Sequence, residues 1–341
     1  MSNRKGKILL IGPNFYYFLH SIKNVFQQMG YNVLVCQYDN PIHPYGVINK
    51  IHYKLSQDKE ALKELSRINY QSQIESVFKQ FKPQITFIVN GDNLLSSTVK
   101  LFSESSNVGI WLFDSVQRFP ECMANLLFAH KVFCYEKNDI TFIKQSCGVD
   151  AFFIPQAVDE SLYYKMNTKK VWDIVFAGDI FRSEKRKKIV PSVVNKYNQC
   201  SICIWGEYKP IYKDFVKWLL REKRDVYMNR NTNVEQLNID YNKAKIVLNV
   251  HHEQQRNGAN PKVFEIAMSG AYQICDANPY LEEVFQNGEV GLFHNETELY
   301  ELIDYALTHD MSEKSEKAYQ IVLENHTLSS RLKQVLNILN Q

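Results

Sequence analysis

The sequence predicts an α/β protein built from two doubly wound domains, and three observations predict it. Short apolar runs such as Lys7–Ile11 and Ile246–Val250 alternate along the chain with segments that place apolar residues at helical spacing. This alternation is typical of a parallel sheet covered by helices. The length of 341 residues favours two domains. A polar stretch beginning at Pro155 predicts domains 1–155 and 156–341, with a last helix that is a candidate to pack back on the first.

The first domain begins with a strand, a helix and a second strand. Lys7–Ile11 forms the first strand, Gly30 ends the helix, and Asn32–Cys36 forms the second strand. This unit starts a doubly wound sheet. Gly12 stands alone where a dinucleotide-binding turn has three glycines, so no dinucleotide cofactor is expected there.

Polar residues follow the later strands of the first domain, at the edge where such sheets bind ligands. Asp92 follows the strand Ile85–Val89. Asp114 follows the strand Val108–Phe113. Together with His20, near the start of the first helix, these carboxylates are the candidate general bases, and Asp114 is the first choice. Two alternatives stay open, because Asp114 also suits a helix N-cap and His20 could simply pack.

The second domain opens with the strand Trp172–Phe176 and a turn at Gly178. A basic segment that includes Arg182 and Arg186 follows at the start of a helix. Free backbone N–H groups, a helix start and cations together make an anion site that suits a diphosphate. The alternative is a solvated basic face of the helix.

The stretch Lys245–Asp276 combines a buried strand, a polar loop, a helix and a second strand. Pro261 suits the first helical position, and Gly270 ends the helix. Glu265 stands between apolar residues in this helix, where an unpaired carboxylate is costly. Two roles for Glu265 stay open: a core carboxylate paired with Lys262, or an acceptor for the two hydroxyls of a ribose.

Composition and charge exclude several classes of protein. Hydrophobic residues make up 45% of the chain and charged residues 23%, as in ordinary globular proteins. The net charge of +3, without aromatics interleaved among the basic residues, argues against nucleic-acid binding. Neither a secretory signal nor a transmembrane anchor is expected, since no apolar run is long enough. Seven cysteines, an odd count, predict reduced thiols and a cytoplasmic location.

Three further segments bear on metals, membranes and sugars. The chain has no Asp-x-Asp, and His251 and His252 lack a third ligand at suitable spacing, so no metal site is expected. The basic segment Lys213–Arg224, which also carries Phe215 and Trp218, is a candidate for peripheral association with the inner face of a membrane. The aromatic segment 39–54 suits either sugar stacking or a plain surface loop.

Motifs of the second half follow one another in a characteristic order. They read WDIVFAGDIFRSEKRKKI, CIWG, YNKAKIVLNVH, NPKVFEIAMSGAYQICD and HTLSSRL. This series resembles the GT-B glycosyltransferases, and more narrowly the glycosyl transferase group 1 type of spore-maturation-protein-like and bacterial polysaccharide enzymes. The resemblance covers about half of the chain, from Trp172 onward, and the first half is similar only in strand order, KPQITFIV and WLFDS. It implies two Rossmann-like domains facing across a cleft, with the donor on the C-terminal and the acceptor on the N-terminal domain.

The resemblance also implies roles for individual residues. Glu265 would contact the donor ribose, and Gly178 and Arg186 the donor diphosphate. The other members of the implied donor site are Arg182, Trp205, Gly206, Asn249, Asn260 and Lys262. Two positions depart from the pattern: Asn257 stands where related families carry a second glutamate, and Lys262 where an arginine is usual.

The activity implied by the resemblance is metal-independent glycosyl transfer without a cofactor. The donor would be a nucleotide diphosphate sugar, with a uridine diphosphate sugar first among the candidates. The acceptor would be a saccharide or a lipid-linked glycan, in bacterial surface polysaccharide or glycoconjugate synthesis. The alternative is a non-catalytic relative that binds a nucleotide or a glycan within a larger complex.

Overall fold

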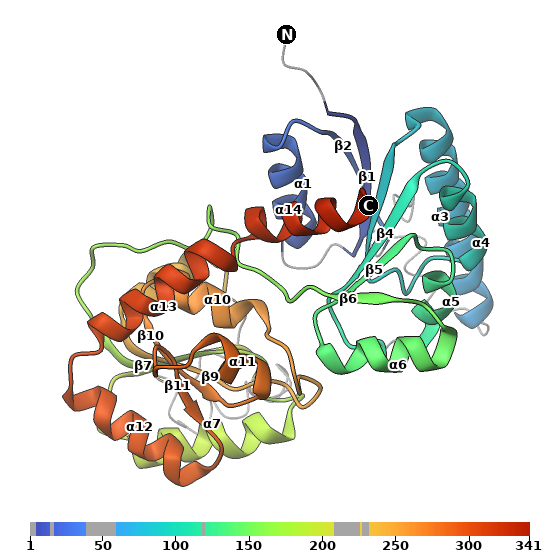
Figure 1. The fold of residues 1–341 in the computed structure, drawn as a ribbon. Helices are drawn as coiled ribbons and strands as arrows, with labels where there is room; N and C mark the ends of the chain where they lie inside the picture. Colours follow the sequence, from blue (N-terminus) through green and yellow to red (C-terminus); the bar gives the residue numbers. More distant parts are fainter. Residues whose placement is uncertain (1–4, 14–16, 39–58, 118–119, 208–225, 227–231) are drawn as a thin grey trace, which may run out of the picture. The chain divides into compact units, whose positions relative to one another are not determined.

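The computed structural model describes residues 5–13, 17–38, 59–117, 120–207, 226 and 232–341 (Figure 1). Contacts divide the chain into two compact units. Unit 1 comprises Met1–Ile154 together with Leu332–Gln341, and unit 2 comprises Pro155–Arg331. Each unit is built on one parallel sheet, which confirms the predicted α/β class.

The sheet of unit 1 has the strand order β2-β1-β3-β4-β5-β6 among the described residues, and every neighbouring pair is parallel. The strands are β1 (Lys7–Gly12), β2 (Asn32–Gln37), β3 (Ile85–Val89), β4 (Asn107–Leu112), β5 (Lys131–Cys134) and β6 (Ala151–Phe153). The central strands β3 and β4 are buried almost throughout, because helices cover both faces.

Helices connect these strands in the manner of a doubly wound sheet. They are α1 (Phe18–Gln28), α3 (Lys59–Phe81), α4 (Ser96–Ser103), the 3₁₀ helix η1 (Pro120–Cys122), α5 (Met123–Leu126) and α6 (Lys137–Cys147). Figure 1 shows α3, α4 and α5 on one face of the sheet and α1 on the other. Each face therefore has its own apolar layer.

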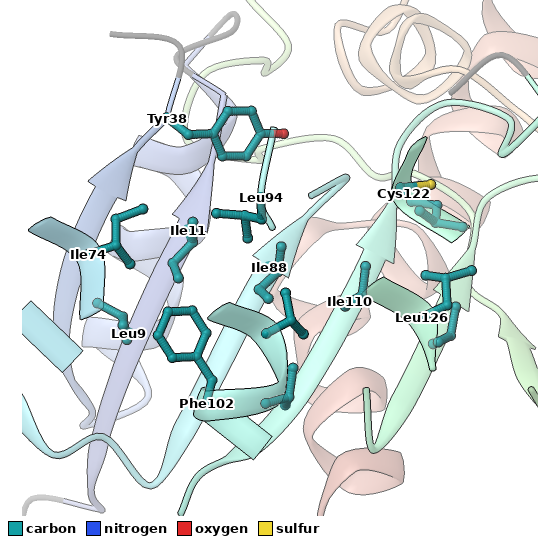
Figure 2. Close-up of a cluster of buried hydrophobic side chains, with 14 of the residues drawn as sticks. Leu9, Ile11, Tyr38, Ile74, Ile88, Leu94, Phe102, Ile110, Cys122 and Leu126 are labelled. Carbon is teal, nitrogen blue, oxygen red and sulfur yellow. The ribbon is translucent and has the colours of Figure 1, made fainter. Parts of the chain in front are cut away.

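The layer beneath α3, α4 and α5 is the larger core of unit 1 (Figure 2). Alternate residues of neighbouring strands, such as Ile11, Ile88 and Ile110, point into it. Ile74 of α3 and Phe102 of α4 close the layer from the helix side. Burial of these side chains fixes the register of the strands and hence the positions of the residues at their ends.

The sheet of unit 2 has the order β11-β10-β9-β7-β8, again parallel throughout the described residues. The strands are β7 (Trp172–Ala177), β8 (Ile202–Trp205), β9 (Ala244–Asn249), β10 (Tyr272–Asp276) and β11 (Gly291–Phe293). The helices are α7 (Glu184–Lys196), α9 (Val234–Asn242), α10 (Pro261–Met268), α11 (Pro279–Val284), α12 (Glu296–Thr308), α13 (Ser312–Asn325) and α14 (Leu328–Leu339). α7 and α12 bury one face of the sheet through Val193, Leu299 and Ile303.

The last helix, α14, starts in unit 2 and ends in unit 1. Asn107 at the start of β4 donates its Nδ2 hydrogen to the carbonyl oxygen of Leu339 at 2.5 Å. Gly109 leaves room for the same leucine, because a Cβ there would lie 3.3 Å from Leu339 Cδ1. The C-terminal turns of the chain are thus part of the packing of unit 1.

Each sheet reverses its strand order at one point. In unit 1 the chain passes from β2 across β1 to β3, and in unit 2 from β8 across β7 to β9. At such a reversal the loops after two adjacent strands leave in opposite directions and open a crevice at the carboxyl ends, where α/β proteins bind ligands. The crevices lie between β1 and β3 and between β7 and β9.

Candidate functional site

Arg186 joins the ends of the two strands that flank the crevice of unit 2. It lies in the first turn of α7, where the N-cap Ser183 accepts its backbone N–H at 3.3 Å. Its Nε donates to the carbonyl oxygen of Val250 after β9 at 2.7 Å, and its Nη1 donates to that of Asp179 after β7 at 3.0 Å. Burial lowers the pKa of Arg186, yet a guanidinium stays charged in proteins. A fixed positive charge therefore stands at the reversal point.

Gly178 and Gly206 allow the ends of β7 and β8 to approach this arginine. A Cβ on Gly206, whose φ is +120°, would stand 2.1 Å from the carbonyl oxygen of Gly178. A Cβ on Gly178 would lie 3.3 Å from Nη1 of Arg186. Gly206 needs glycine because backbone occupies the space that a side chain would take, whereas a side chain at Gly178 would crowd the guanidinium.

Lys262 brings a second cation to the same edge from α10. The helix begins as predicted, with Pro261 in its first turn and the N-cap Asn260 accepting the N–H of Val263 at 3.2 Å. The side chain of Lys262 is half-buried and makes neither a hydrogen bond nor an ion pair with any described residue. Burial lowers the pKa of Lys262, the charge of Glu265 opposes that shift, and the positive charge of Arg186 adds to it. Two like charges thus lie close enough to repel each other.

Glu265 lies one turn further along α10, near the side chain of Tyr163. The carboxylate is half-buried. Burial raises the pKa of Glu265, while the charge of Lys262 and the nearby hydroxyl of Tyr163 oppose the rise. The proposed pairing with Lys262 is therefore a longer-range attraction without ion-pair contact. Tyr163 escaped the sequence analysis because it lies in the polar stretch before β7, far from α10 in sequence.

A carboxylate after β10 organises the centre of the same edge. Asp276 Oδ1 accepts the backbone N–H of His251 at 2.7 Å and lies 2.9 Å from its Nδ1. Asp276 Oδ2 forms an ion pair of 2.7 Å with Lys185 Nζ of α7. The neighbouring cations hold the pKa of Asp276 well below its usual range despite burial. Lys185 and Asp276 are further residues of the edge that the implied donor set did not contain.

Three other members of the implied donor set bond within unit 2. Trp205, at the end of β8, donates its indole N–H to Asp240 Oδ2 at 2.9 Å. Asn249, at the end of β9, is buried and donates to Gln273 Oε1 at 3.2 Å. Arg182 remains 70% exposed, and its ion pairs are with Asp179 at 3.3 Å and Glu207 at 3.5 Å. Trp205 and Asn249 therefore direct these polar groups to partners within the unit.

The three candidate bases of unit 1 belong to segments that meet at the carboxyl edge of its sheet. Asn90, in the turn after β3, accepts the N–H of Phe113 at 2.7 Å, so the ends of β3 and β4 are tied together. The ring of Phe113 meets that of Phe18 at the start of α1, with centroids 5.2 Å apart. Asp114 follows Phe113 directly, and Asp92 and His20 lie two residues beyond Asn90 and Phe18. The first helix after Asp114 is η1, so Asp114 is not a helix N-cap.

Asp92 is the candidate base that stands at the reversal point of unit 1. It follows β3, which lines the crevice with β1, whereas Asp114 follows the next strand. The hydroxyl of Tyr38, after β2, donates to Asp92 Oδ1 at 2.7 Å. His20 is exposed on α1.

Several features concern metals and membranes. Within the described ranges, no three His, Cys, Asp or Glu side chains gather as a cluster that could hold a metal ion. No helix in the described part of the chain has the length and apolar character needed to cross a bilayer. The basic segment Lys213–Arg224 and the aromatic segment 39–54 lie outside the described residues.

Comparison with known proteins agrees with this architecture. Residues 184–337 match the family described as "Glycosyl transferase-like". The curated proteins include no match to the sequence. Sucrose-phosphate synthase from Thermosynechococcus elongatus is similar in structure, with a TM-score of 0.70 over 99% of both chains at 11% identity. The trehalose-6-phosphate synthase OtsA gives a TM-score of 0.68 at 11% identity over 98% of this chain and 99% of its own. Anabaena HepE, solved with UDP and glucose, gives 0.63 at 13% identity over 98% and 99%.

These matches show the fold of the protein. The fold is GT-B, as the resemblance implied, and the segment from α7 through most of α14 is glycosyl transferase-like.

Proposed function

We propose that the enzyme transfers a sugar from a nucleoside diphosphate donor bound on unit 2 to a saccharide or glycan acceptor bound on unit 1. The observation that carries the donor assignment is the pair of cations at the crevice of unit 2. Arg186 and Lys262 come from the first turns of two different helices, and the positive charge of Arg186 helps to lower the pKa of Lys262. Such repulsion is relieved when an anion lies between the two groups, and the N-terminus of α10 favours the same charge.

The ribose end of the donor would lie at Glu265. An ionised carboxylate offers about four acceptor sites, which is enough to bind two vicinal hydroxyls. A ribose and a diphosphate are joined directly in a nucleoside diphosphate. Glu265 and Lys262 lie one helical turn apart, a spacing that suits these two parts of one ligand.

The reaction would be a displacement at the anomeric carbon of the donor sugar. A hydroxyl oxygen of the acceptor forms the new bond to this carbon as the bond to the diphosphate oxygen breaks. The hydroxyl proton passes to a carboxylate of unit 1 if the configuration inverts, and the nucleoside diphosphate leaves with the bonding electron pair. Asp92, Asp114 and His20 are the candidate bases, and the topology favours Asp92 because it stands at the reversal point.

Charge on the departing diphosphate would be neutralised by the protein, without a divalent metal. Arg186 and Lys262 are the cations proposed for this role, and Arg182 is a further one at the exposed rim. Such fixed charges stabilise the developing negative charge without reorganisation. HepE was crystallised with UDP and glucose, and this supports a uridine diphosphate sugar as the first donor to test.

We place the enzyme in the cytoplasm, in the synthesis of surface polysaccharide or glycoconjugates. All seven cysteines are free thiols, which supports a cytoplasmic location. The resemblance to bacterial polysaccharide enzymes supports a role in surface polysaccharide or glycoconjugate synthesis. Association with the inner face of a membrane through Lys213–Arg224 is a hypothesis that liposome flotation would test.

The donor assignment is tested by comparing Lys262→Ala with Lys188→Ala. Lys188 lies on α7 with its side chain 75% exposed and serves as the matched control. We expect Lys262→Ala to weaken UDP binding about tenfold, as the loss of one charge-assisted contact does, and to leave uridine binding unchanged. Titration calorimetry with UDP and with uridine measures both, and EDTA added to the wild type tests metal independence. An equal loss for uridine and UDP, or no loss for either, would contradict a diphosphate at this crevice.

A further inference from the structure

The turn after β3, at residues 90–94, carries Asp92 and has an unusual backbone. Asn90 lies in the left-handed region with a φ of +59°, and Gly91 follows with a φ of +87°. A left-handed φ is uncommon for a residue other than glycine, and it persists where the surroundings enforce it. The turn also stands at the reversal point of unit 1, because β3 lines the crevice.

Neighbouring elements enforce this backbone through hydrogen bonds. Asn90 donates its backbone N–H to the carbonyl oxygen of Trp111 in β4 at 2.9 Å. Asn125 of α5 is buried and donates to the carbonyl oxygen of Gly91 at 2.7 Å. Gln71 of α3, also buried, donates to a further carbonyl oxygen of the turn at 3.0 Å. Three elements therefore fix the turn before any ligand binds.

Tyr38, directly after β2, is the anchor that reaches the carboxylate itself. Only 6% of the tyrosine is exposed. Its hydroxyl donates to Asp92 Oδ1 at 2.7 Å and accepts the backbone N–H of Gly91 at 3.3 Å. The carbonyl oxygen of Val89 lies 3.1 Å from the same hydroxyl. A phenol has one hydrogen, and the bond to the carboxylate is the shorter and stronger use of it.

The bond from Tyr38 leaves the other oxygen of the carboxylate available. Asp92 Oδ2 makes neither a hydrogen bond nor an ion pair with any described residue, and the side chain is partly exposed. An aspartate side chain has two rotatable bonds, and a hydrogen bond at Oδ1 restricts both. Oδ2 is therefore held in one place and stays open to a ligand.

We propose that Tyr38 is a positioning residue, which holds the Asp92 carboxylate so that Oδ2 takes the proton of the attacking hydroxyl. The proposal rests on the proposed function of Asp92 as the general base. As the hydroxyl oxygen bonds to the anomeric carbon, its proton moves to Oδ2, and the nucleoside diphosphate leaves with the electron pair of the broken bond. A base that is fixed before the acceptor arrives takes the proton without first being ordered.

The first test compares Tyr38→Phe with Tyr31→Phe in the full chain. Tyr31 is the matched control, because it lies just before β2 and its ring packs edge to face on Phe26, with centroids 6.3 Å apart. The probe is UDP-glucose with water as the acceptor, and the initial rate of UDP release is measured. We expect Tyr38→Phe to lower kcat about tenfold and to leave the KM for UDP-glucose within twofold. Tyr31→Phe should behave as the wild type.

The second test repeats Tyr38→Phe in an Asp92→Asn background. Once the base is gone, its positioning no longer matters, so the added substitution should lower kcat by less than about twofold. A tenfold loss in both backgrounds would show that Tyr38 acts through the turn as a whole, and this would overturn the proposal. Full activity in Asp92→Asn alone would remove the base assignment, and the positioning role would fall with it.

Crystal structures of Tyr38→Phe and Tyr31→Phe give a third readout, which needs no turnover. In Tyr38→Phe we expect the Asp92 side chain to occupy more than one conformation, while Asn125 and Gln71 still hold the backbone of the turn. In Tyr31→Phe the carboxylate should stay in place. An unmoved Asp92 carboxylate in Tyr38→Phe would overturn the positioning role and leave the base assignment of Asp92 standing.

Discussion

Single residues at the crevice of unit 2 differ in how their charges are compensated. Asp276 is surrounded by Lys185 and His251, which hold its pKa low, so this carboxylate and its lysine are largely neutralised by each other. Lys262 has no such partner among the described residues. Glu265 forms no ion pair with the described residues, and only the charge of Lys262 acts on it at longer range. The uncompensated charges, and not the paired ones, are those a ligand can exploit.

The proposed general base of unit 1 can be tested by a single substitution. Asp92→Asn keeps the size of the side chain and can still bond to Tyr38, but it cannot accept a proton from the acceptor. For an inverting enzyme we expect kcat to fall about 100-fold or more, with UDP affinity unchanged. Asp114→Asn is the matched control and should lower kcat by a smaller factor. Initial rates with the best donor, together with calorimetry, measure both, and a larger loss for Asp114→Asn would reverse the assignment.

At the scale of elements, the donor crevice depends on how closely strand ends and helix starts approach. The turns after β7 and β8 touch backbone to backbone at Gly178 and Gly206. Arg186 then ties the turn after β7 to the end of β9 through two carbonyl oxygens. The N-cap bonds of Ser183 and Asn260 fix where α7 and α10 begin. These contacts make the crevice a rigid frame before any ligand binds.

Gly206→Ala should therefore damage both stability and donor binding. Its Cβ would stand 2.1 Å from the carbonyl oxygen of Gly178, so backbone must move, and the free energy of unfolding should fall by about 3 kcal/mol or more. Gly148→Ala is the control, because its φ of +72° imposes the strain alone, with no atom within 4 Å of the new Cβ. In that control the free energy of unfolding should fall by about 1 kcal/mol. Chemical denaturation measures both, and equal losses would show that the contact between the two turns is not tight.

At the scale of the whole molecule, the chain passes twice between the units, and both passages are joined within unit 2. Val158, just after the first passage, donates its N–H to the carbonyl oxygen of His326 and accepts that of Leu328. The second passage continues in α14 and carries Leu339 into the packing of unit 1. The two ends of the chain thus contribute to one unit, and unit 1 is complete only when the last helix is in place.

Leu339→Ala tests this dependence. The leucine is 2% exposed and packs on Gly109, so a cavity at this site should cost about 2–4 kcal/mol of unfolding free energy. Leu323→Ala on α13, where the side chain is 40% exposed, should change stability by less than about 0.5 kcal/mol. UDP affinity should stay the same in both variants, because the donor crevice belongs to unit 2. A loss of UDP binding in folded Leu339→Ala would show that α14 also shapes that crevice.

The sequence by itself determined much of the local structure. Apolar periodicity predicted the parallel strands and their helices. Pro261, directly after Asn260, predicted where α10 begins, at the point where a polar loop gives way to apolar residues. Because parallel strands share one carboxyl edge, the polar residues after each strand could be assigned to that edge before the structure was known. The motifs after Trp172 then indicated the glycosyltransferase class.

Only the tertiary structure decided which side chains meet. The ion pair between Lys185 and Asp276 and the bridge from Arg186 to Val250 join segments far apart in sequence. Periodicity records which face of an element is buried, but it contains no information on strand order, and strand order decides which turns adjoin the crevice. The choice of Asp92 over Asp114 has the same origin, since it depends on where the sheet reverses. Local sequence therefore determines where the helices and strands form. The packing of the strands into one sheet determines which charged side chains meet at its carboxyl edge.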